Sequence, residues 1–194
     1  MPSLSTKLLV FTLSTAPTAL TAPAPFSLNT RDAPSHLSLS NLKRAVYTTA
    51  SSPGTYTKDD YCGEANPAYT SSPSTSPLAT DCVALYNAHP GPGYWTISSA
   101  DTAASEGEGR DGWVRLGQSG SCAFEVRWSS GNGNGDGEVG EYKFGTNDLR
   151  FYIRAHVERA TEGEKVDGRV GVSSTVWCDT GSGMGFVDWR VILS

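Results

Sequence analysis

Residues 122–128 read Cys-Ala-Phe-Glu-Val-Arg-Trp and carry the clearest structural signal in the sequence. Cys122, Phe124, Val126 and Trp128 alternate with small or charged residues, which is the two-residue period of a β-strand. Such a strand buries one face and exposes the other. Residues 122–128 are therefore predicted to form a β-strand with one apolar face.

The segments that follow this strand continue the pattern of strands and helices. Residues 129–140 are rich in Gly and Asn and predict a hairpin connection to a returning strand at 142–144. Residues 146–148 (Thr-Asn-Asp) favour a helix N-terminus, and apolar residues then recur at helical spacing up to Ala160. Further strands are predicted at 169–178 and 186–193.

The segments before it predict a helix between short strands. Ser76-Pro77 favours a helix start, with Ser as the N-cap and Pro at the first helical position. Leu78, Cys82 and Leu85 recur at helical spacing, and the Pro and Gly residues at 90–93 end the helix. The remaining predictions are strands near Tyr56 or Tyr61, at 94–97 and at 112–116, with a surface loop at 98–111.

This order of elements predicts an α+β fold, a two-layer sandwich of one antiparallel sheet and two helices. The chain contains four cysteines, Cys62, Cys82, Cys122 and Cys178. An even number behind a secretory leader indicates two disulfides, for which three pairings are open. We favour Cys82–Cys122, which joins a helix to a following strand, and Cys62–Cys178, which joins the start of the domain to a late strand.

The N-terminus has the composition of a secretory signal peptide. Lys7 precedes an apolar run at 8–13, and small residues continue to Ala22, so residues 1–22 are assigned to the leader. The run is too short and too interrupted by polar residues and Pro to span a bilayer. We therefore expect a secreted, extracellular protein without stable membrane insertion.

Residues 23–44 end in the dibasic pair Lys43-Arg44, which is typical of a pro-peptide processing site. Such a pair is also common on protein surfaces, so both interpretations stay open. Cleavage after Arg44 would leave a single domain of residues 45–194, with its core at 61–193.

Composition and motifs argue against nucleic-acid, metal and cofactor binding. A formal net charge of −5 disfavours contact with phosphates. Residues 132–137 resemble only the first half of a calcium loop, because Lys143 stands where a Glu is needed. Residues 181–185 lack the strand-then-helix context of a phosphate-binding loop. No cysteine and histidine spacing suggests zinc.

No set of catalytic residues is evident, so we do not expect an enzyme. A G-x-S-x-G motif is missing, and His89 and His156 are interpreted as packed or helix-terminal residues. The acidic residues at 59–64 and 106–111 stand in polar surroundings, where nothing raises a pKa. One alternative stays open, a hydrolase of cell-wall polysaccharide with an unseen carboxylate pair.

The five tryptophans are expected to fill the core, and an exposed one would be a partner-binding anchor or a sugar-stacking platform.

Several short motifs occur in a fixed order along residues 61–178. They are Tyr61-Cys62-Gly63, then 81–85 (Asp-Cys-Val-Ala-Leu) with 93–97 (Gly-Tyr-Trp-Thr-Ile), then 120–124 (Gly-Ser-Cys-Ala-Phe), then 144–148 (Phe-Gly-Thr-Asn-Asp) with 169–172 and Cys178. In this order they resemble the fungal extracellular-protein-two effector family, whose shared unit is the necrosis-inducing-factor domain. The chain departs from that pattern at 64–66, at the Gly- and Asn-rich insertion 131–137 and beyond Cys178.

The resemblance implies a small, disulfide-stabilised effector that a plant-associated fungus releases into the host apoplast. Some members provoke host cell death, and none is known as an enzyme. We accordingly expect a monomer that binds a host or microbial surface protein or glycan and uses no cofactor. A weaker similarity to the killer-toxin type-four fold keeps an antimicrobial role as an alternative.

Overall fold

The strand predicted at 122–128 forms in the larger of two antiparallel sheets. In the computed structural model the described residues are 45–49, 58–129, 140–181 and 183–194. The expected signal peptide, the pro-peptide and the dibasic pair Lys43-Arg44 lie outside the described residues, as does the calcium-like segment 132–137.

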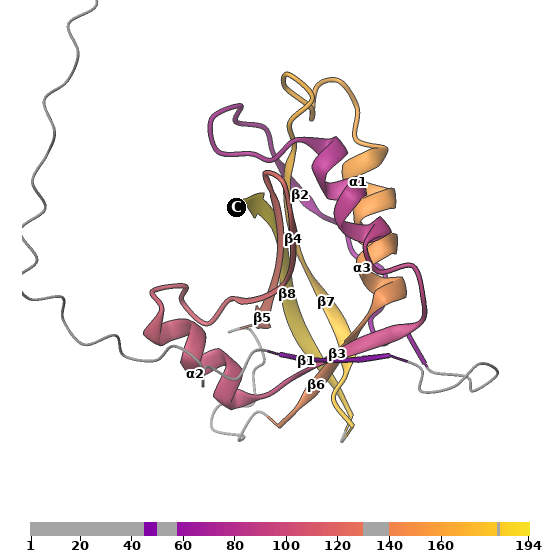
Figure 1. The fold of residues 1–194 in the computed structure, drawn as a ribbon, viewed down its shortest axis with the longest axis vertical. Coiled ribbons are helices and arrows are strands. Elements are labelled where there is room, and N and C mark those ends of the chain that lie inside the picture. The colour runs from indigo at the N-terminus through magenta and orange to yellow at the C-terminus, as the bar shows by residue number, and fades with distance from the viewer. Residues whose placement is uncertain (1–44, 50–57, 130–139, 182) are drawn as a thin grey trace, which may run out of the picture. The chain divides into compact units, whose positions relative to one another are not determined.

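The larger sheet has five strands in the order β2-β7-β8-β5-β4 (Figure 1). Its strands are β2 (Ala68–Thr70), β7 (Gly171–Asp179), β8 (Met184–Leu193), β5 (Cys122–Trp128) and β4 (Val114–Ser119). Its register places Glu125 opposite Arg190, and Thr175 opposite Asp188. Because side chains alternate between the two faces of a strand, these four polar residues share one face. We call it the outer face.

Two helices cover the opposite, inner face. They are α1 (Ala79–Asn87) and α3 (Thr146–Tyr152), and α3 continues as a π-helical segment, Ile153–Glu158 (Figure 1). Trp189 of β8 is fully buried here and stacks on Tyr152 with ring centroids 4.7 Å apart. Phe124 stacks on the same indole at 5.8 Å. Strand β5 thus packs Phe124 against the core as predicted, but Ala123 and Glu125 on its other face are buried as well.

The smaller sheet has the order β1-β3-β6, with β1 (Val46–Thr49), β3 (Gly93–Ile97) and β6 (Tyr142–Gly145). The α+β class is confirmed, but two sheets are present where one was expected. The predicted hairpin between residues 122–128 and 142–144 is wrong, because β4 and β8 already occupy both edges of β5. Strand β6 therefore pairs with β3.

The surface loop predicted at 98–111 contains a third helix, α2 (Ser99–Gly107). The carboxylate of Asp101 accepts hydrogen bonds from the backbone N–H of Ser98 (2.8 Å) and from its hydroxyl (2.6 Å). This is a capping box, which satisfies N–H groups that the first helical turn leaves unpaired. Among the described residues no helix has the length and apolar composition needed to cross a bilayer.

Two further boundaries differ from the predictions. Helix α1 is capped at Leu78, while the hydroxyl of Ser76 donates to the carbonyl of Thr70 at 3.1 Å and so holds the preceding turn. The early strand predicted near Tyr56 or Tyr61 lies instead at β2, and Tyr56 is outside the described residues. The prediction of Ser76 as the N-cap is therefore wrong. Its hydrogen bond to Thr70, six positions earlier, leaves no signal in the local sequence.

Candidate functional site

Both favoured disulfides form, and each is accompanied by an aspartate that fixes the chain beside it. The first is Cys82–Cys122. Next to it, the carboxylate of Asp81 accepts hydrogen bonds from the backbone N–H and from the hydroxyl of Ser121, both at 2.7 Å. These bonds lower the pKa of Asp81, which keeps it ionised. The start of α1 is therefore fixed to the turn between β4 and β5.

The second disulfide is Cys62–Cys178. Beside it, Asp148 at the start of α3 accepts three backbone hydrogen bonds. The donors are the N–H groups of Tyr61 (3.0 Å), Cys62 (3.1 Å) and Gly145 (2.8 Å). The same carboxylate thus caps its own helix and holds the segment that carries the first cysteine.

The pKa of Asp148 is raised to about 7, mainly by burial and also by a hydrogen bond with the carboxyl of Asp60, whereas the three N–H donors oppose the shift. A raised carboxyl pKa is a common sign of an acid catalyst. Here the residue is 2% exposed and its two oxygens are occupied by backbone donors, so a substrate has no access. The sequence analysis missed this shift, because enclosure of a helix-capping carboxyl depends on the distant segment 58–63.

The two histidines lie in aromatic clusters rather than beside a nucleophile. His89 contacts Tyr47 and Trp95, with ring centroids 5.3 and 5.1 Å away. His156 lies 3.4 Å from the hydroxyl of Tyr69. Burial lowers the pKa of both histidines, so both are neutral at pH 7.

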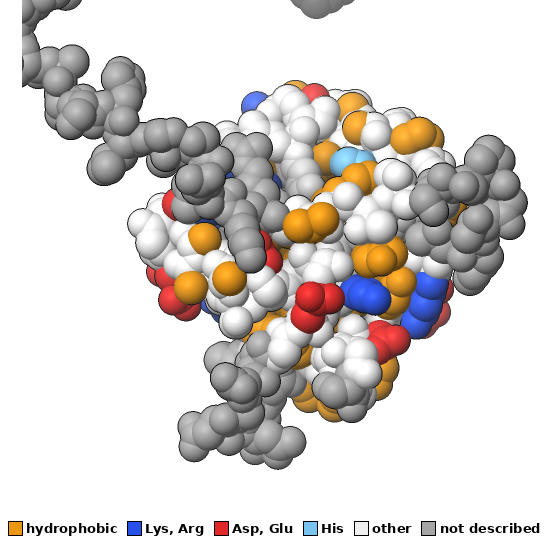
Figure 2. Space-filling model, turned by 60° about the horizontal axis from the view of Figure 1, so that its bottom comes forward, with side chains coloured by type: hydrophobic (Ala, Val, Ile, Leu, Met, Phe, Trp, Pro, Cys, Tyr) orange, Lys and Arg blue, Asp and Glu red, His pale blue; other side chains and the backbone are white. Residues whose placement is uncertain are grey.

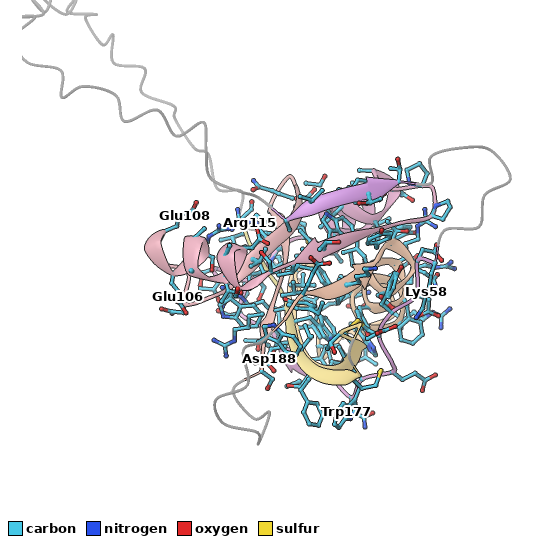
Figure 3. All side chains as sticks on the ribbon, turned by 90° about the horizontal axis from the view of Figure 1, so that it is seen from below. Lys58, Glu106, Glu108, Arg115, Trp177 and Asp188 are labelled. Carbon is cyan, nitrogen blue, oxygen red and sulfur yellow. A yellow bond between two sulfur atoms is a disulfide. The ribbon has the colours of Figure 1, made fainter. Side chains whose placement is uncertain are left out.

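The predicted acidic clusters do not form a metal site within the part of the chain that the structure describes. Glu106 and Glu108 project outward at the end of α2 (Figure 3), and Glu108 pairs with Arg110. In the other cluster, Asp60 lies beside Asp148, and Asp59 accepts a backbone hydrogen bond of 2.8 Å from Asn147.

A cleft of about 550 Å³ lies between the smaller sheet, α2 and the edge strand β4. Tyr47, Trp95 and His89 form its aromatic side, and Asp101 and Arg115 are among its polar lining. Asp101 already caps α2, and Arg115 is bonded to a buried carboxylate. The charged groups of this cleft are therefore engaged in structural contacts.

That carboxylate is Glu125, which has no solvent exposure and lies on the outer face of the larger sheet. Arg115 donates to one of its oxygens through two nitrogens at 3.0 and 3.1 Å. Arg190 donates to the other oxygen through two nitrogens at 2.6 and 2.9 Å. The guanidinium groups of Arg190 and Arg127 stack on Trp113, 4.0 and 4.4 Å from its ring centre. The network gives the outer face a fixed arrangement of charges.

Further along the same face, Trp177 is 49% exposed, and its ring centroid lies 3.6 Å from the ring centroid of Phe186. One step along the ladder, Asp188 accepts hydrogen bonds from the hydroxyl of Thr175 (2.6 Å) and from Arg127 (3.3 Å). Figure 3 shows Trp177 and Asp188 projecting outward from this part of the sheet. We call Trp177, Phe186, Thr175, Asp188 and Arg127 the outer strip.

A shallow hollow of about 640 Å³ adjoins the outer strip. It is bordered by Thr175, Asp188 and Arg127 on the sheet and by residues 64–66 on the other side. The hydroxyl of Ser174 donates to the carbonyl of Asn66 at 3.1 Å and holds the two sides together. Residues 64–66 are also the segment at which the sequence departs from the motif pattern.

The exposed tryptophan could not be identified from the sequence. Trp95, Trp113 and Trp189 are buried, Trp128 is half-buried, and Trp177 is exposed. All five occur in strands or next to them, so composition alone does not separate them. Only the register of β7 with β8, which aligns Trp177 with Phe186, places this ring on the outer face.

Residues 61–178 match a family model described as "Pathogen effector; putative necrosis-inducing factor". A search of curated proteins found no match. The matched range begins at Tyr61 and ends at Cys178, so it contains both disulfides and both aspartates described above. On the face drawn in Figure 2, the basic side chains of the described residues stand in small groups beside acidic ones.

Proposed function

The chain belongs to this pathogen-effector family, and we propose that it is a secreted, non-enzymatic effector that acts by binding a molecule of its host. Family membership is the observation that carries this proposal. The two disulfides support the secreted part of it, since such bonds persist in oxidising compartments outside the cytosol.

The non-enzymatic part is supported by what the titratable groups of the matched range contact. Asp148 and Asp81 hold backbone segments, and Glu125 is enclosed by two arginines. His89 and His156 are neutral and packed against aromatic rings. Each of these groups therefore already serves the fold.

The outer strip supports binding as the mode of action. It combines an aromatic pair, of which Trp177 is exposed and Phe186 half-buried, with fixed polar groups and an adjoining hollow, which is the composition of recognition surfaces in general. The motif residues of the family lie in the scaffold behind it. We infer that members share the scaffold and that recognition depends on surface residues outside the motifs.

The test is infiltration of leaves with purified protein. The full-length sequence is expressed, and the protein is collected after secretion. Folded protein is expected to provoke a host response, and protein unfolded by reduction and alkylation of its disulfides is expected to provoke none. Equal responses to both would contradict recognition of a folded surface. Growth inhibition of competing microbes without any leaf response would contradict a host target and favour the killer-toxin-like alternative.

A further inference from the structure

We propose that the outer strip binds a neutral, extended glycan of the kind found in cell walls, with Trp177 as the stacking platform. This inference names the target class of the binding activity proposed above and in that sense rests on it.

The indole of Trp177 offers a flat apolar ring that is about half open to solvent, with the ring of Phe186 packed against it at a tilt of 37°. Trp177 is 49% exposed while its ring contacts Phe186 on the neighbouring strand. Phe186 thus restricts the indole, and a restricted ring loses little conformational entropy when a ligand covers it. The carbon–hydrogen face of a pyranose ring is a flat apolar surface of matching type, and its hydroxyl groups point outward from the ring edge.

Polar groups that suit those hydroxyls continue along the strip. Both oxygens of Asp188 are oriented, one by the hydroxyl of Thr175 and the other by Arg127. An ionised carboxylate has about four acceptor positions, so each oxygen keeps capacity for a ligand hydroxyl. From Trp177 of the outer strip to Ser173 in the lining of the adjoining hollow, β7 runs over four residue steps, roughly 13 Å at the rise of a strand. That length suits an extended chain better than a single small molecule.

The charges of this surface favour an uncharged ligand. Arg115, Arg127 and Arg190 are matched by Glu125 and Asp188 on the sheet and by Glu64 at the rim of the hollow. Three positive and three negative groups leave no net charge to attract a polyuronate, a phosphate or a basic peptide. A protein partner would in turn call for a broader apolar centre than Trp177, Phe186 and the exposed Met184 two residues before Phe186 on β8.

The platform is held from behind by the second disulfide. Cys178 is bonded to Cys62, and the N–H of Gly63 donates to the carbonyl of Trp177 at 2.9 Å. Asp179 donates through its N–H to the carbonyl of Tyr61, also at 2.9 Å. The backbone on both sides of Trp177 is thus fixed, and a site on fixed elements is preorganised for its ligand.

The experiment is co-sedimentation of the purified, secreted protein with insoluble chitin, cellulose and β-1,3-glucan, and with polygalacturonate as a charged comparison. We expect at least one neutral glycan to bind, with an affinity that is unchanged by about 1 M salt because no counterions are released. Trp177→Ala is expected to weaken binding by about tenfold or more. Phe151→Ala removes another exposed aromatic side chain, one on α3, and is expected to bind like the wild type.

Thr175→Val tests the polar part of the strip separately, since it removes one hydroxyl and keeps the side-chain volume. It is expected to weaken glycan binding while the melting temperature stays near that of the wild type. The proposal is overturned if no neutral glycan binds, if Trp177→Ala binds as tightly as Phe151→Ala, or if only polygalacturonate binds in a salt-sensitive way.

The two proposals fail in different ways. If the wild type provokes a host response that Trp177→Ala loses, yet no neutral glycan binds, the glycan inference is overturned and the effector function stands. If a neutral glycan binds through Trp177 but no host response occurs at any dose, the effector function is overturned and the glycan site stands.

Discussion

The backbone N–H of Cys62 donates a hydrogen bond of 3.1 Å to the carboxylate of Asp148, across 86 positions of the sequence. This bond joins the first cysteine motif to the Phe-Gly-Thr-Asn-Asp motif at the start of α3. The bond between Ser121 and Asp81 joins the other two cysteine motifs in the same way. These motifs therefore hold one another, and neither of the two bonds involves a residue of the outer strip.

Gly145 is the motif residue for which the structure allows least change. A Cβ atom at this position would lie 1.9 Å from the carbonyl oxygen of Asp59. Gly145→Ala is expected to destabilise the protein by about 3 kcal/mol or to prevent secretion, because the obstructing atom is backbone. Gly91→Ala, where a Cβ meets nothing within 4 Å, should stay within about 0.5 kcal/mol of the wild type. Urea denaturation of both variants checks this. Equal denaturation midpoints would contradict the predicted clash with the carbonyl of Asp59.

The raised pKa of Asp148 makes stability depend on pH. The native carboxyl has a pKa of about 7, whereas an aspartate in an unfolded chain has one of about 3.9. The native state therefore binds this proton more tightly. The resulting contribution to the free energy of unfolding is complete below about pH 4 and is lost as the pH rises toward 7.

Asp148→Asn isolates this contribution, because its side chain is neutral at every pH. His89 and His156 have lowered pKa values and act in the opposite direction, but both remain in the variant. Between about pH 4 and pH 8 the wild type should lose stability relative to Asp148→Asn, on the order of a few kcal/mol. Urea titrations across this range measure it, and parallel pH profiles of the two proteins would contradict the assignment.

Each disulfide closes a long loop and should contribute substantially to stability. The sequence separations are 40 residues for Cys82–Cys122 and 116 for Cys62–Cys178. In the loop-entropy description, replacing both cysteines of a pair by serine costs about 4 kcal/mol for the first and about 5 kcal/mol for the second. Chemical denaturation of the two double variants tests this. A larger loss from the shorter loop would indicate that contacts beside the bond, and not loop closure, dominate.

Glu125 is expected to be the most sensitive charged residue of the outer face. Glu125→Gln removes the buried negative charge between Arg115 and Arg190, so it should cost about 3 kcal/mol. Asp188→Asn breaks a partly exposed pair with Arg127 and should cost about 1 kcal/mol or less. If both variants lose a similar amount of the free energy of unfolding, enclosure of Glu125 is not what stabilises the network.

Local sequence was sufficient where one residue pattern determined one element. The alternation at 122–128 and the long β-branched run before Cys178 predicted β5 and β7, and the α+β class followed from the order of elements. The two strands depend on the residues of the element itself. Both favoured disulfide pairings are also confirmed, one between a helix and a later strand and the other between the start of the domain and a late strand.

Features that depend on distant partners were not predicted. Strand β6 pairs with β3 because the edges of β5 are occupied, and no residue of β6 encodes that. The pKa of Asp148 depends on the segment around Asp60, and the exposure of Trp177 depends on the register of two strands. Helix α2 did have a local signal, Ser98 and Asp101 at capping-box spacing, which the small and acidic composition of 98–111 obscured.

The central claim is that the family motifs build the scaffold and that Trp177 on the outer strip carries recognition. The most direct measurement compares Trp177→Ala and Phe151→Ala, both secreted and purified, for melting temperature and for the host response over a range of infiltrated doses. The account predicts that both variants melt near the wild-type temperature and that only Trp177→Ala loses the response. A Trp177→Ala protein that is folded and still provokes the full response would contradict it.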